Sequence, residues 1–99
     1  MSMSSPLGPA RRVTHACFSV HAPADPSLMP RVLEVFAKRG LVPSQWHSTL
    51  CGGGRRELEI DVQLDDVEPA VAERIAAVLR QMVGVDRVLT SEKRFAPAA

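Results

Sequence analysis

Strict alternation of apolar and polar residues marks two segments of the chain as β-strands with one buried face. Residues 13–21 and residues 57–64 both show this period of two, and residues 57–64 show it most regularly. The side chains expected to point inward are Ala16, Phe18, Val20, Leu58, Ile60, Val62 and Leu64. Two more strands are predicted at residues 41–51, where Trp46 shares a face with Ser48 and Leu50, and at residues 85–91.

Apolar residues repeat instead at helical spacing in two segments between these strands. Residues 27–40 form the first predicted helix, and Gly40 stands where a left-handed C-terminal cap belongs. Ser27 is the expected N-cap, because Pro30 then becomes the third helical residue, whose position needs no N–H. Residues 69–83 form the second predicted helix, closed by Gly84.

The predicted order is therefore strand, helix, strand, strand, helix, strand. An α+β, ferredoxin-like βαββαβ fold satisfies both this order and the rule that crossover connections are right-handed. It has an antiparallel four-stranded sheet, in which the third strand lies between the first and second, and two helices on one face. We expect one domain at residues 13–91, a flexible N-terminal tail at residues 1–12 and a C-terminal tail at residues 92–99.

The composition is that of an ordinary globular protein, with 45% hydrophobic and 23% charged residues among 99. A formal net charge of +1 argues against nucleic acid as a partner. No apolar run approaches the roughly 20 residues that span a bilayer, and the N-terminus lacks the apolar core of a signal peptide. We therefore expect a cytoplasmic protein that binds neither nucleic acid nor membrane.

The two cysteines, Cys17 and Cys51, are too few for a disulfide framework and suit a reducing compartment. In the predicted strand order they lie two strand spacings apart, about 9.6 Å at roughly 4.8 Å per spacing. A disulfide needs Cα atoms within about 7 Å, so both thiols are expected to be free. Cys17 on an open sheet face has no base to activate it, which argues against a nucleophile.

Three histidines share the predicted outer face of the sheet with acidic residues. They are His15, His21 and His47, beside Glu57, Glu59 and Asp61. A metal site or an acid–base pair competes here with a plain polar surface of cross-strand neighbours. His15 and His21 lie about 20 Å apart at roughly 3.3 Å per residue and cannot share one ion. We favour the polar surface, and expect no metal, no cofactor and no catalytic residue.

Gly52-Gly53-Gly54-Arg55-Arg56 invites comparison with a phosphate-binding loop. It lacks the Gly-Lys-Ser/Thr ending, and a strand rather than a helix follows it, so we interpret it as a flexible hairpin turn. Trp46 is expected in the core or at a subunit contact.

The stretch from Pro26 to Gly40, the strand after it and the closing Gly84-Val85-Asp86 resemble an ACT domain. The resemblance covers residues 13–91 and is greatest to the small subunit of acetolactate (acetohydroxyacid) synthase. It implies a non-catalytic regulatory or stabilising subunit in branched-chain amino-acid biosynthesis. Such a subunit would form a homodimer through the sheet and bind the large, thiamine-diphosphate-dependent catalytic subunit. The alternative is a free-standing ACT module that binds a small amino-acid effector.

The resemblance also implies where an effector would bind. Many ligand-binding ACT domains carry Pro-Gly at the first loop–helix junction, whereas this chain has Pro26-Ser27. An effector carboxylate is expected on the amides of Ser27 and Leu28, at the positive end of the helix, with Asp25 facing the ammonium group. The second wall would be the partner's matching loop or the strand at Ser44, Gln45 and His47. A plain helix cap without ligand is the alternative.

Overall fold

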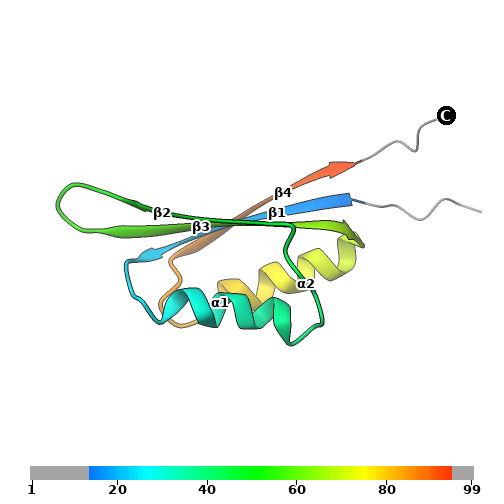
Figure 1. Ribbon diagram of the computed structural model, residues 1–99, viewed down its shortest axis with the longest axis horizontal. Helices are drawn as coiled ribbons and strands as arrows, with labels where there is room; N and C mark the ends of the chain where they lie inside the picture. Colours follow the sequence, from blue (N-terminus) through cyan, green and yellow to red (C-terminus); the bar gives the residue numbers. More distant parts are fainter. Residues whose placement is uncertain (1–13, 95–99) are drawn as a thin grey trace, which may run out of the picture.

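The computed structural model describes residues 14–94, and the six elements follow the predicted order. They are β1 (Thr14–Pro23), α1 (Leu28–Ala37), β2 (Gln45–Cys51), β3 (Glu57–Val67), α2 (Pro69–Arg80) and β4 (Arg87–Arg94). The strands form one antiparallel sheet in the order β2-β3-β1-β4. Both helices lie on the same face of it (Figure 1). The predicted ferredoxin-like α+β fold is confirmed; residues 1–12 lie outside the described range, as does most of 92–99.

The helix-covered face of β1 and β3 forms the core. All seven side chains expected to point inward from these two strands are buried. Across from them Phe36 of α1 meets Phe18 edge-on, with ring centroids 5.6 Å apart. Buried Thr14 keeps its hydroxyl satisfied by donating to the Val67 carbonyl oxygen at 2.8 Å. The alternation in sequence is therefore expressed directly as an inner and an outer face.

Two of the predicted strands begin later than the pattern suggests. The segment at 41–51 becomes extended only at Gln45, because the Leu41 N–H is still bonded to Phe36 O after α1 and Pro43 has no N–H to pair. The last strand begins at Arg87 rather than residue 85, because the Val85 N–H completes the turn after α2 by donating to Met82 O. It then continues to Arg94, and β3 likewise continues to Val67.

Both helices end earlier than predicted, and both expected glycine turns are present. α1 ends at Ala37 with Lys38 as its C-cap, and α2 ends at Arg80. Gly40 and Gly84 follow with φ of 70° and 95°, the left-handed conformation expected of them. Among the described residues, neither helix is long or apolar enough to cross a membrane.

The β2–β3 hairpin projects beyond the helices at one end of the sheet (Figure 1). β2 is an edge strand with every residue exposed except half-buried Trp46, which packs against the core as expected. The turn depends on Gly52, whose φ is +103° and whose added Cβ would collide with the Arg55 carbonyl oxygen. Cys17 and Cys51 are two strands apart and both thiols are free, which confirms that prediction.

Candidate functional site

The junction between β1 and α1 is closed by an aspartate. Ser27 is the N-cap residue, as predicted, but its side chain makes no bond to the helix. Instead Asp25 Oδ1 accepts hydrogen bonds from both the Ser27 N–H and the Ser27 hydroxyl, each at 2.9 Å. The Leu28 N–H donates to the Asp25 carbonyl oxygen at 3.0 Å. Asp25 therefore organises the turn, while Ser27 serves as its donor.

These bonds occupy the two amides on which an effector carboxylate was expected. The Ser27 and Leu28 N–H groups both donate to Asp25, and neither Pro26 nor Pro30 has an N–H to offer. The same contacts lower the pKa of the Asp25 carboxyl group below its ordinary value. The largest cause is the Ser27 N–H bond, then the Ser27 hydroxyl bond, and the positive charge of Arg31 adds to them. Asp25 is thus ionised at neutral pH.

A hollow of about 860 Å³ opens beside this turn, between α1 and the β2–β3 hairpin. We call it the junction hollow. It is lined by Pro23, Ala24, Asp25, Pro26, Met29, Ser48, Leu50, Arg55, Arg56 and Leu58. Its floor is apolar, its rim carries one carboxylate and two guanidinium groups, and its volume is typical of a small-molecule site.

Strand geometry supplies the floor of the junction hollow. Leu50 pairs with Leu58 across β2 and β3, and both point to the helix-covered face. Met29 approaches from α1, where its sulfur accepts a hydrogen bond from the Ser48 hydroxyl at 3.5 Å. Met29 and Leu50 are 37% and 54% exposed, because the hairpin runs past the end of the helix layer. Apolar surface thus remains open to water here.

A backbone bond ties the hairpin to the loop before α1. The Ala24 N–H donates to the Arg56 carbonyl oxygen at 3.2 Å. This bond fixes the base of the hairpin, whose Arg55 and Arg56 line the hollow, against the Asp25 turn.

The residues expected to bind an effector fall in two separate places. Asp25 and Pro26 line the junction hollow, whereas Gln45 and His47 lie on the opposite face of the sheet. Leu28 is buried in the core, and Ser44 precedes β2 with its hydroxyl bonded to Gln63 O at 3.2 Å. The expected set therefore does not form one pocket. Because side chains alternate along β2, it is Ser48 and Leu50 that face Asp25.

Most of the lining of the junction hollow was not predicted from the sequence. The lining residues that were not predicted are Pro23, Ala24, Met29, Ser48, Leu50, Arg55, Arg56 and Leu58. A signal for two of them was present, since Ser48 and Leu50 share the alternation of Trp46 toward the helices. The positions of the two arginines could not be predicted in this way, because a hairpin turn has no repeating pattern that indicates the direction of its side chains.

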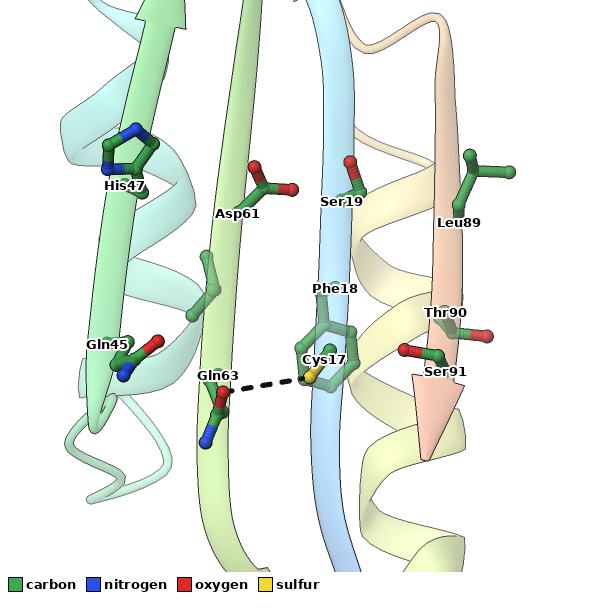
Figure 2. Close-up of a pocket in the computed structure, with 11 residues that line it drawn as sticks. Cys17, Phe18, Ser19, Gln45, His47, Asp61, Gln63, Leu89, Thr90 and Ser91 are labelled. Carbon is green, nitrogen blue, oxygen red and sulfur yellow. Dashed lines mark hydrogen bonds between the residues drawn. The ribbon is translucent and has the colours of Figure 1, made fainter. Parts of the chain in front are cut away.

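The outer face carries a second, smaller hollow of about 250 Å³ (Figure 2). Its floor is the open sheet, and its polar side chains come from all four strands: Cys17, Ser19, Gln45, His47, Asp61, Gln63, Thr90 and Ser91. Figure 2 shows the Cys17 thiol directed at the Gln63 side-chain oxygen, 3.9 Å away. This contact joins the polar side chains of β1 and β3.

The histidines of this face are cross-strand neighbours of carboxylates, as predicted. His15 Nδ1 lies 2.7 Å from Asp65 Oδ1, and His21 Nδ1 lies 4.0 Å from Glu59 Oε1. The pKa of Asp65 is lowered, first by a hydrogen bond from Gln63 and further by Ser44 and His15. Within residues 14–94 no group of three His, Cys, Asp or Glu side chains is placed to hold a metal ion.

Comparison with solved structures finds this fold in domains of two other proteins. The ACT domain from GTP pyrophosphokinase of Chlorobium tepidum matches in solution with a TM-score of 0.60 at 12% identity, covering 78% of this chain and 84% of that one. Its crystal structure matches with a TM-score of 0.60 at 11% identity, covering 80% and 99%. The C-terminal domain of MgtC from Mycobacterium tuberculosis matches with a TM-score of 0.56 at 16% identity, covering 94% and 100%. At such identities the likeness shows the fold.

A family model adds membership to this structural likeness. The model of the ACT-like domain matches residues 10–95, nearly the whole chain. A search of the curated proteins with this chain finds no match. The two solved relatives are not acetolactate synthase subunits, so that narrower resemblance rests on residues 26–40 and 84–86 alone. The chain belongs to the ACT-like domain family, whose ACT domains are regulatory, non-catalytic modules.

Proposed function

We propose that this chain is a regulatory subunit that takes a small apolar carboxylic acid into the junction hollow and conveys its presence to a catalytic partner. The junction hollow is the observation that carries the proposal. It combines an open apolar floor with charged groups on its rim, and it lies at the loop–helix junction of an ACT-like fold. Convergent polar groups around an apolar pocket are the usual design of a ligand site.

Regulation would follow from the way the hollow is built. Its walls come from the β1–α1 loop, α1 and the β2–β3 hairpin, so a ligand in contact with all three fixes their relative placement. A partner that prefers that placement then binds the liganded chain more tightly, and the ligand in turn binds the assembled complex more tightly. No reacting group on this chain is needed for such linkage.

The first candidate for the catalytic partner is the large subunit of acetolactate synthase. Its support is the resemblance of residues 26–40 and 84–86 to the small subunit of that enzyme. Branched-chain amino acids are then the first effectors to test. The alternative to a synthase subunit is that this chain is a free-standing ACT module that senses a small ligand. Its support is that the solved neighbours named above come from proteins other than that synthase.

Self-association through the sheet is part of the proposal. β2 and β4 are the two edges of the sheet, and the face opposite the helices bears no further layer within residues 14–94. Exposed strand edges favour pairing with another strand. Sedimentation at micromolar concentration is expected to give a mass near twice 10.7 kDa, and a monomer would contradict this part of the proposal.

Two matched leucine variants test the assignment of the hollow. Leu50 and Leu89 are both 54% exposed and both lie on edge strands, but only Leu50 lines the junction hollow. Calorimetric titration with valine, leucine, isoleucine and 4-methylpentanoate is expected to give heat with the wild type and Leu89→Glu for at least one of these ligands, and with Leu50→Glu for none. Equal behaviour of the two variants would show that the ligand binds elsewhere.

The partner is tested with purified components. The chain is mixed with a purified acetolactate synthase large subunit, and co-elution and synthase activity are measured with and without ligand. Co-elution with a changed rate is expected for the first candidate. Ligand binding by the chain without co-elution favours the free-standing module instead.

A further inference from the structure

We infer that the ligand of the junction hollow is an apolar carboxylate anion without an ammonium group, and not an α-amino acid. This inference rests on the proposed function and narrows its ligand class. It comes from the charges that line the hollow, from the state of the amides at the start of α1, and from the shape of the floor.

The charges on the rim do not balance. Asp25 contributes one negative charge, while Arg55 and Arg56 contribute two positive charges. Within the described residues no hydrogen bond or ion pair engages either guanidinium group. Arg31 lies close enough to Asp25 to lower the pKa of its carboxyl group, so the one negative charge already faces a cation. A zwitterion would leave this positive excess unchanged, whereas a monoanion reduces it.

The carboxylate of Asp25 already has a structural task. Its Oδ1 atom accepts both hydrogen bonds from Ser27 that close the turn before α1. An ammonium group drawn to Asp25 would have to share a carboxylate that is also faced by the Arg31 charge. The hollow thus has no acidic group dedicated to a ligand cation among its lining residues.

Anion recognition falls instead to the hairpin. The amides of Ser27 and Leu28 are bonded to Asp25, so the first turn of α1 cannot offer them to a carboxylate. Guanidinium groups suit that role, because their planar N–H donors match the two oxygens of a carboxylate. Arg55 and Arg56 carry such groups and line the hollow together with Met29, Leu50 and Leu58. A branched aliphatic acid places its chain on this floor and its charge at the arginines.

Three compounds that share one carbon skeleton separate the alternatives. Leucine carries both charges, 4-methylpentanoate lacks the ammonium group, and 3-methylbutylamine lacks the carboxylate. Calorimetry is expected to rank 4-methylpentanoate first, about tenfold tighter than leucine, with no heat from the amine. Leucine binding as tightly as 4-methylpentanoate, or more tightly, would overturn the inference and leave the proposed function intact. Binding of none of the three would overturn the inference and the assignment of this hollow together.

The variant Asp25→Asn gives opposite signs for the two ligand classes. Its side-chain oxygen still accepts from Ser27, so the turn is kept while the negative charge is lost. Binding of 4-methylpentanoate is expected to strengthen about two- to fivefold, since one repulsive charge is removed. If Asp25 recognises an ammonium group instead, leucine binding weakens in this variant, and that result contradicts the inference.

Arginine variants complete the test. Arg55→Gln and Arg56→Gln are each expected to weaken 4-methylpentanoate about fivefold, the effect of an exposed charge contact. Arg74→Gln is the matched control, because Arg74 is an exposed arginine of α2 that does not line the hollow. Circular dichroism checks that all variants are folded. Equal weakening by Arg74→Gln, or none by either hairpin variant, would show that the hairpin does not bind the anion.

Discussion

The outer face of the sheet and the junction hollow differ in how their charged and polar side chains are paired. On the outer face, side chains of neighbouring strands pair with one another: His15 with Asp65, His21 with Glu59 and Cys17 with Gln63. At the junction hollow, Arg55 and Arg56 stand over exposed apolar surface. Polar groups that are already paired gain less from a ligand than unpaired ones do. A ligand gains most binding free energy where it covers exposed apolar surface and neutralises an unpaired charge, as in the junction hollow.

The largest expected effect tests whether the two faces of the sheet differ in stability as they do in chemistry. Phe36→Ala removes a ring that is fully buried against Phe18 and should lower the free energy of unfolding by about 3–5 kcal/mol. Leu89→Ala on the outer face should change it by less than about 0.5 kcal/mol when unfolding is measured at a concentration at which the chain is monomeric. Urea unfolding followed by circular dichroism measures both. Similar losses for the two variants would mean that the outer face is also packed in solution.

The next effect concerns the hairpin that forms one wall of the junction hollow. Gly52→Ala should lower the free energy of unfolding by about 1–3 kcal/mol, because its Cβ would meet Arg55 O and its φ is positive. Gly53→Ala is the control, since a Cβ there meets no atom within 4 Å. Ligand affinity should fall in Gly52→Ala as the arginines are displaced. Unchanged affinity in this variant would show that the hairpin does not shape the site.

The sequence predicted the fold because the periodicity of the core is local and strong. The alternation at residues 57–64 and the helical repeats require no knowledge of distant neighbours, and they fix which face of each element is buried. Element ends were less accurate, since they depend on single bonds such as Leu41 N–H to Phe36 O. Such bonds become visible only once the chain has folded.

The site was predicted only in part, for a related reason. Asp25 and Pro26 do line the junction hollow, but Gln45 and His47 lie on the opposite face, one residue out of step with Ser48 and Leu50. A period of two makes any such choice sensitive to a shift of one residue. The hydrogen bonds from the Ser27 and Leu28 N–H groups to Asp25 could not be predicted from periodicity either. A turn is set by a few specific hydrogen bonds, which leave no repeating pattern in the sequence.

The smallest expected effect compares one carboxylate from each region through pH. Asp25 at the junction and Asp65 on the outer face both have a pKa below the ordinary value of 3.8 in the folded chain. A lowered pKa means that the ionised carboxylate favours folding at pH above about 4, and that this contribution is lost as pH falls through the lowered pKa. The free energy of unfolding should therefore decrease as the pH is lowered below about 4.

Removing either charge should make that dependence shallower. Urea unfolding between pH 2 and pH 6 is expected to show a smaller pH slope for Asp25→Asn and for Asp65→Asn than for the wild type, because each variant has one fewer carboxyl group to protonate. The two variants should then differ in ligand binding, since Asp25 lines the junction hollow and Asp65 does not. If Asp65→Asn alters the affinity for 4-methylpentanoate as much as Asp25→Asn does, the two regions are coupled, and the contrast between them does not hold.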